Sequence, residues 1–210
     1  MNSSTLRTAV DGRAGLIECA IDHPAAGPAR GLAVLCHPHP QHGGTMDNKV
    51  VQTLARAFVQ LGYTSVRFNF RGIGASQGAW DEGCGEIDDA LSVVAAQRQT
   101  GQPLVLAGFS FGSYVASQAA LRLAAAGEGA ERVVLVGPAV KSFDMAAVPA
   151  DTLVIHGEKD DVVALTDVFD WARPQALPVT VLPGAGHFFH GQLPVLKQIV
   201  VSAWASRAGA

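Results

Sequence analysis

Residues 108–112 have the sequence Gly-Phe-Ser-Phe-Gly, and the segments on either side of them differ in character. Residues 103–107 form a short apolar run, which predicts a buried strand, and residues 113–121 are rich in small side chains, which predicts a helix. Gly-x-Ser-x-Gly between a strand and a helix is typical of a nucleophile elbow, a strained turn at which the two elements approach so closely that only glycine fits beside the serine. We therefore expect Ser110 to project its hydroxyl above the edge of a sheet. The alternative is an ordinary glycine turn in which Ser110 caps the helix.

Length and composition favour one compact α/β domain. The chain has 210 residues, of which 49% are hydrophobic and 16% are charged, and these proportions are unlike those of a disordered chain or a coiled coil. No repeat, linker or charge block divides the chain, so we expect residues 1–210 to form a single domain, with residues 1–15 as a loose lead-in. The formal net charge is -3 and the basic residues are scattered, which predicts no nucleic acid and no anionic membrane as a partner.

Cysteine usage and the N-terminal sequence predict a cytoplasmic protein. The three cysteines, Cys19, Cys36 and Cys84, share no Cys-x-x-Cys spacing, and an odd number without a framework is typical of a reducing compartment. The first residues are polar and lack the apolar core of a signal peptide. The longest apolar runs are shorter than a membrane span.

Apolar runs alternate with helical segments along the chain, which indicates βαβ crossovers. We predict an α/β fold with a mostly parallel, twisted sheet of about seven strands and helices on both faces. The predicted strands are residues 16–21, at an edge of the sheet, and residues 32–36, 63–70, 103–107, 132–136, 152–155 and 179–182. The predicted helices are residues 49–61, capped by Asp47 or Asn48, and residues 86–99, 113–121, 165–173 and 193–206.

Two further strand ends carry polar groups that could activate a serine. The strand at 152–155 leads into His-Gly-Glu-Lys-Asp-Asp at residues 156–161, and the strand at 179–182 leads to Gly186 and His187. Parallel strands bring their carboxyl ends to one edge of the sheet, where open α/β sheets bind ligands. A serine hydroxyl is a weak nucleophile until a base accepts its proton and a third group orients that base. These strand ends therefore predict a base and a carboxylate near the serine.

These motifs and their order along the chain resemble the α/β-hydrolase superfamily, in particular its small, lidless bacterial serine esterases and dienelactone-hydrolase-like members. Residues 69–76, Asn-Phe-Arg-Gly-Ile-Gly-Ala-Ser, also resemble a loop of those proteins, and the matches extend from about residue 37 to residue 187. The resemblance implies an α/β-hydrolase fold. It also implies that Ser110 attacks an acyl carbon, that His187 transfers the proton, and that an aspartate stabilises the imidazolium.

The resemblance selects Asp160 as the acid, because family members place it three residues after the glycine of the His-Gly pair. Asp161 is the nearest alternative, and Asp144, after the preceding strand, is a more distant one. Residue 110 is neither the cysteine of true dienelactone hydrolases nor the carboxylate of dehalogenases and epoxide hydrolases. Acyl-enzyme chemistry on esters, thioesters or amides is therefore expected.

An oxyanion hole requires two backbone amides, and we predict those of Phe111 and His39. Phe111 follows the nucleophile, and His39 is the only residue between Pro38 and Pro40, neither of which has an N–H. Three histidines in this loop, at positions 37, 39 and 42, could in principle bind a metal. The intervening prolines and the lack of a thiolate or carboxylate partner favour structural roles instead, so we expect neither metal nor cofactor.

The short connection at residues 137–151 leaves no room for a cap domain. We expect an open site bounded by residues 37–46, residues 72–85 and the pair Phe188-Phe189. Packing in the core beneath the His187 loop is an equal alternative for these two phenylalanines. Arg71 is expected to pair with Glu86 or Asp88 and so fix its loop, rather than to bind substrate.

The prediction for function is a serine hydrolase that cleaves small-molecule carboxylic esters, or thioesters, through an acyl-enzyme on Ser110 without a cofactor. The same three residues could also support acyl transfer to another acceptor, or peptide cleavage. A binding protein that keeps the fold without turnover is the alternative from a different class.

Overall fold

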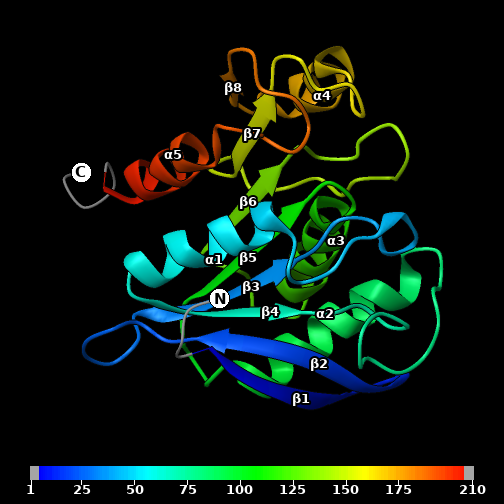
Figure 1. Cartoon of the computed structure of the whole chain (residues 1–210), viewed down its shortest axis with the longest axis vertical. Helices are drawn as coiled ribbons and strands as arrows, with labels where there is room; N and C mark the ends of the chain where they lie inside the picture. The colour runs from blue at the N-terminus through cyan, green and yellow to red at the C-terminus, as the bar shows by residue number, and fades with distance from the viewer. Residues whose placement is uncertain (1–4, 206–210) are drawn as a thin grey trace.

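The structure is a computed structural model that describes residues 5–205. An eight-stranded sheet has the order β1-β2-β4-β3-β5-β6-β7-β8 (Figure 1). The strands are β1 (Leu6–Gly12), β2 (Gly15–Asp22), β3 (Gly31–Cys36), β4 (Tyr63–Phe68), β5 (Leu104–Phe109), β6 (Arg132–Val136), β7 (Leu153–Gly157) and β8 (Val179–Leu182). The helices are α1 (Lys49–Gln60), α2 (Cys84–Gln97), α3 (Phe111–Ala125), α4 (Leu165–Ala172) and α5 (Leu193–Ala205), with 3₁₀ turns η1 (Pro40–His42) and η2 (Arg173–Gln175).

The predicted mostly parallel sheet is confirmed. Strands β3 to β8 are joined by parallel pairings, and the two antiparallel pairings are those of β1 with β2 and of β2 with β4. Every residue of β3 and of β5 is buried, as their unbroken apolar sequences require of central strands with helices on both faces. No helix or strand interrupts residues 137–152 between β6 and β7, so the fold lacks a cap domain.

Two hydrophobic clusters lie on opposite faces of the sheet. Helices α2 and α3 pack on one face and α1 and α5 on the other (Figure 1). The rings of Phe58, Tyr63 and Trp204 meet edge to face, and the indole N–H of Trp204 donates to the Tyr63 hydroxyl at 3.1 Å. This cluster attaches the end of α5 to α1. Among residues 5–205, no helix has both the length and the apolar character needed to cross a membrane.

The start of α1 shows which of two predicted caps acts. Asn48 is the N-cap, because its Oδ1 accepts from the amides of Val50 at 2.9 Å and Val51 at 3.4 Å. Asp47 instead accepts hydrogen bonds from Arg7 and Arg67. These contacts fix the end of the loop that joins β3 to α1.

The predicted loose lead-in at residues 1–15 is wrong from Leu6 onward; residues 1–4 lie outside the described part of the chain. Strand β1 pairs with β2 along its full length, from Leu6 opposite Ile21 to Gly12 opposite Gly15, so β2 is not an edge strand. Of the seven residues of β1, only Val10 is buried. An edge strand with so little buried surface lacks the apolar alternation by which a strand is detected.

The turn from β5 into α3 depends on two glycines. A Cβ on Gly108 would lie 2.1 Å from the carbonyl oxygen of Gly112, and a Cβ on Gly112 would lie 2.2 Å from the carbonyl oxygen of Cys36. Real Cβ atoms do not approach backbone so closely. The first turn of α3 therefore packs directly on the end of β3.

We expect Gly112→Ala to lower the free energy of unfolding by about 1–3 kcal/mol, because the added methyl group must push the backbone of β3 away from α3. Gly129→Ala is the matched control, since its Cβ would meet only Ala124 at ordinary van der Waals distance. Urea denaturation of both variants measures the difference. Equal stability of the two variants would contradict the close contact.

Candidate active site

Ser110, His187 and Asp160 form a continuous chain of hydrogen bonds. The Nε2 atom of His187 lies 3.0 Å from the Ser110 Oγ, and its Nδ1 atom lies 2.7 Å from Oδ2 of Asp160. The three residues follow β5, β8 and β7, respectively, so three carboxyl ends of the parallel sheet bring them together. This geometry suits transfer of the serine proton to the imidazole, with the carboxylate accepting from the other ring nitrogen.

Ser110 has φ 56° and ψ -121°, a backbone conformation that residues other than glycine rarely adopt. The surrounding backbone holds it there: the Ser110 amide donates to the Val136 carbonyl at 2.9 Å. Ser113, which the sequence analysis did not single out, donates from its hydroxyl to the Gly108 carbonyl at 2.9 Å. The one available signal for this supporting role was a serine within the first turn after the elbow.

The loop after β7 holds Asp160 in place. Its Oδ1 accepts from the backbone amides of Val162 at 2.9 Å and Val163 at 2.8 Å. Burial alone would raise the pKa of Asp160, but the hydrogen bonds from His187 and from these two amides hold that pKa below its ordinary value. Asp160 is therefore a buried carboxylate that stays ionised.

The two alternative acids lie elsewhere. Asp161 and Asp144 are both exposed, and neither has a hydrogen bond with His187. The contact with the imidazole thus favours the predicted Asp160, whose catalytic role stays a prediction until it is measured.

The two predicted oxyanion amides lie in segments that pack on each other. Phe111 is the first residue of α3, and His39 immediately precedes η1 in the loop after β3. Within residues 5–205, neither amide donates a hydrogen bond to the backbone or to a side chain. Because Gly112 packs on Cys36 and His37, the start of α3 and this loop are adjacent, as an oxyanion hole requires.

The histidines of this loop bond the loop to itself and to the segment that follows β4. The His37 Nε2 accepts from the Phe70 amide at 3.1 Å, and its Nδ1 lies 2.6 Å from the Pro38 carbonyl, so the ring is neutral with its proton on Nδ1. The His39 ring stacks on His42, with centroids 4.4 Å apart. In the described part of the chain, no three His, Cys, Asp or Glu side chains are grouped as metal ligands.

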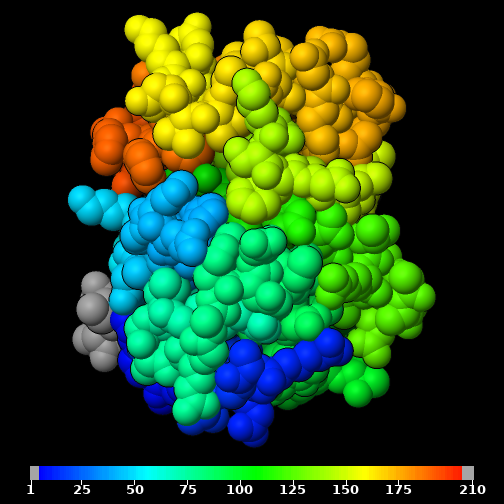
Figure 2. Space-filling view, turned by 90° about the vertical axis from the view of Figure 1, so that its right-hand side faces the viewer, coloured from blue at the N-terminus to red at the C-terminus, as the bar shows by residue number. Residues whose placement is uncertain are grey.

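A cavity of about 270 Å³ opens in front of the serine, on the face shown in Figure 2. Phe188 is 44% exposed and lines this cavity, whereas its neighbour Phe189 is buried in the core, so the pair divides between the two predicted roles. The lining residues are Pro38, His39, His42, Gly43, Gly44, Asn48, Ser110, Val162, His187 and Phe188.

The predicted boundary at residues 72–85 is wrong, because that segment does not line the serine cavity. Its Trp80 packs against the rings of His39 and Phe111 and lines a separate cavity with Gly72 and Ile73. The segment therefore supports the wall of the site from behind.

The predicted ion pair of Arg71 exists with a different partner. Its Nη2 lies 2.8 Å from the Asp89 carboxylate, while Asp88 pairs with Arg13 and Arg122 and Glu86 accepts from backbone amides. Asp89 and Glu86 are three residues apart on the buried face of α2, and Asp88 points away from that face. Sequence proximity alone could not distinguish these faces.

Protonation of His37 should weaken the fold at acid pH. Burial lowers the pKa of His37 to about 4 from its ordinary 6.5, so below about pH 6.5 the unfolded chain takes up a proton that the folded chain does not. Stability is lost as the pH falls from that point towards 4, by about 2 kcal/mol between about pH 7 and about pH 4.5.

Urea denaturation of wild type and His37→Gln at about pH 7 and about pH 4.5 measures this loss of stability. The loss should be smaller by about 2 kcal/mol in His37→Gln, whereas exposed His23→Gln should behave as wild type. The same loss in all three proteins would show that His37 titrates normally.

Known proteins share both the sequence pattern and the fold. The profile of the hydrolase family described as serine aminopeptidase, S33, matches residues 27–150. An uncharacterised protein of Rickettsia prowazekii is 32% identical over 181 residues, which cover 79% of this chain and 74% of the relative.

Solved structures agree with this match. A serine hydrolase without a lid from Xanthomonas campestris has 37% identity and a TM-score of 0.85, covering 97% of this chain and 94% of its own. An α/β serine hydrolase homologue from Coxiella burnetii has 36% identity and a TM-score of 0.81, and the match covers 94% of this chain and 96% of the homologue. The chain is thus a serine hydrolase of the lidless α/β-hydrolase fold and belongs to the hydrolase family described as serine aminopeptidase, S33.

Proposed function

We propose that this protein hydrolyses carboxylic esters, or thioesters, of small molecules through an acyl-enzyme on Ser110. The observation that carries the proposal is the unbroken hydrogen-bond chain from the Ser110 hydroxyl through His187 to the ionised Asp160. A hydroxyl in such a chain can lose its proton as it attacks, and the charge that develops on the imidazole faces a fixed carboxylate.

In the first half of the reaction the Ser110 Oγ attacks the acyl carbon while Nε2 of His187 accepts its proton. The carbonyl oxygen becomes an oxyanion, which the amides of Phe111 and His39 would bind. The tetrahedral intermediate collapses, and His187 returns the proton to the departing alcohol oxygen. Water then attacks the acyl-enzyme while His187 accepts a proton from it. His187 returns that proton to the Ser110 Oγ, and the carboxylic acid leaves.

The cavity favours a neutral ester over the substrate that the family description names. An aminopeptidase must bind the α-ammonium group of its substrate, which calls for a carboxylate in the site. None of the residues that line the cavity is acidic or basic apart from histidine, and the nearby Asp160 is occupied by His187. The exposed side chains of Val162 and Phe188 offer apolar contact instead.

The volume of the cavity limits the substrate. About 270 Å³ lies at the small end of ligand pockets, and no cap encloses it. We therefore propose a short or flexible acyl group, with the remainder of the substrate extending into solvent.

Hydrolysis of p-nitrophenyl acetate and butyrate, compared with leucine p-nitroanilide, tests the proposal. We expect wild type to cleave the esters, Ser110→Ala to lose about 10⁴-fold or more in kcat/KM, and the exposed Ser142→Ala to retain activity. Faster cleavage of the anilide than of the esters would favour an aminopeptidase, and ester cleavage unchanged in Ser110→Ala would refute the nucleophile.

Substitution of each adjacent aspartate tests the acid. In Asp160→Asn the amide cannot keep the imidazole in the required tautomer, so kcat should fall by about 10⁴-fold. Asp161→Asn is the matched control and should retain kcat within a few-fold, because its side chain is exposed and apart from His187. The reverse result would move the acid by one residue.

A further inference from the structure

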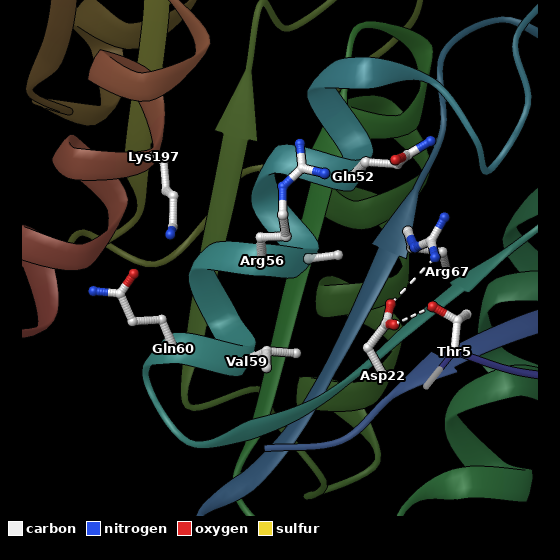
Figure 3. A pocket seen from close by; sticks show the side chains of 9 residues that line it. Thr5, Asp22, Gln52, Arg56, Val59, Gln60, Arg67 and Lys197 are labelled. Atoms are coloured by element: carbon white, nitrogen blue, oxygen red, sulfur yellow. Dashed lines mark hydrogen bonds and ion pairs between the residues drawn. The ribbon is translucent and has the colours of Figure 1, made fainter. Parts of the chain in front are cut away.

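A second cavity, larger than the one at Ser110, lies over the part of the sheet beside α1 (Figure 3). Its volume is about 350 Å³, and it shares no lining residue with the serine cavity. Its walls come from α1, α5, β2 and β4, so segments distant in sequence build it. In Figure 3, Arg67, Asp22 and Thr5 lie together on one side of α1, and Lys197 extends from α5 on the other.

The charges around this cavity are mainly positive. Arg56, Arg67 and Lys197 line it, with Asp22 as the one acidic lining residue among those described. Asp22 is already engaged, since it accepts hydrogen bonds from Arg67 Nη2 at 3.2 Å and from the Thr5 hydroxyl. Among residues 5–205, neither Arg56 nor Lys197 has a carboxylate partner. The cavity therefore presents two cations whose charge is not compensated locally.

Two hydrogen-bonding groups buried beneath the cavity have no partner among the described residues. The Arg67 side chain is only 3% exposed, and its two terminal nitrogens bond Asp22, Asp47 and the Met46 carbonyl. Its Nε has no partner, and neither has the buried hydroxyl of Ser65, two residues earlier on the same face of β4. A buried polar group without a partner costs about 1–3 kcal/mol, so native proteins rarely leave two of them beside each other. Both atoms lie beneath the surface of the cavity, so the polar groups that a ligand can reach are those of the residues that line it.

From these observations we infer that the cavity is a binding site for a small anionic molecule that carries phosphate or carboxylate groups. Arg56 and Lys197 supply the attraction, while Arg67 beneath them is buried and paired with Asp22 and Asp47. Gln52 and Gln60 can donate further hydrogen bonds, and Ala55 and Val59 offer contact to a hydrocarbon part. The site does not depend on ester hydrolysis, because it shares no residue with the serine cavity.

Titration calorimetry with pyrophosphate and with citrate, each at constant ionic strength, tests the inference. We expect saturable binding of at least one of them to wild type, and equal binding to Ser110→Ala. The variant with both Arg56→Gln and Lys197→Gln should bind about tenfold more weakly or worse, because two charge-assisted contacts are removed. The preferred probe distinguishes phosphate from carboxylate ligands.

The matched control carries Lys141→Gln and Arg173→Gln, which remove two exposed cations away from the cavity. It should bind as wild type does. Gln60→Glu, at an exposed position of the rim, adds repulsion without removing a contact and should also weaken binding. Absence of saturable binding of both probes to wild type, or equal weakening in the control, would overturn the inference.

Discussion

The contact between the first turn of α3 and the end of β3 is the constraint on which the candidate active site depends. Gly108 and Gly112 let backbone meet backbone there, and Ser110 between them takes a φ of 56°. Such a conformation costs about 1–3 kcal/mol, and the Ser113 hydroxyl and the fully buried strands β3 and β5 hold it in place. One packing arrangement therefore places Ser110 at the wall of the cavity, directs the start of a helix at it and brings the His39 loop alongside.

Near that contact, burial lowers the pKa of two imidazoles, those of His37 and His156. His37 bonds the backbone with both ring nitrogens and stays neutral, and burial also lowers the pKa of His156, whose Nε2 lies 3.0 Å from the Val163 carbonyl. The pKa of Asp160 is instead held below its ordinary value, by donors from two amides and one imidazole. Asp160 orients the His187 ring through a contact of 2.7 Å, and the Nε2 atom of His156 lies 3.5 Å from the same carboxylate oxygen.

The β1–β2 hairpin adds a second polar region on a different side of the sheet. It extends the sheet past α1, and the face of β2 and β4 beside that helix carries Asp22, Ser65 and Arg67 in addition to Ala20 and Tyr63. Arg67 also holds the Met46 carbonyl, and Asn48, two residues later, lines the serine cavity. The polar face and the serine cavity are thus connected through the start of α1.

Much of the fold could be predicted from local patterns. The unbroken apolar runs of β3, β5 and β6 indicate buried parallel strands, and Gly-x-Ser-x-Gly indicates the turn, because both signals depend on neighbours in the chain. Strand β1 escaped prediction because one buried residue in seven leaves no periodicity to detect. The three candidate residues at Ser110, Asp160 and His187 could be named from motifs that each follow a strand.

Only the tertiary structure decided which side chains meet. Whether Asp160 or Asp161 reaches His187, and whether Arg71 pairs with Asp88 or Asp89, depends on the direction of each side chain within a loop or helix. Phe188 and Phe189 divide between cavity and core for the same reason. The amino-acid sequence by itself determined the elements and the chemistry they carry, because those follow from short-range sterics and burial. Contacts between residues far apart in the chain required the packed sheet, since the direction in which each of two adjacent side chains points depends on the local backbone of its helix, strand or loop.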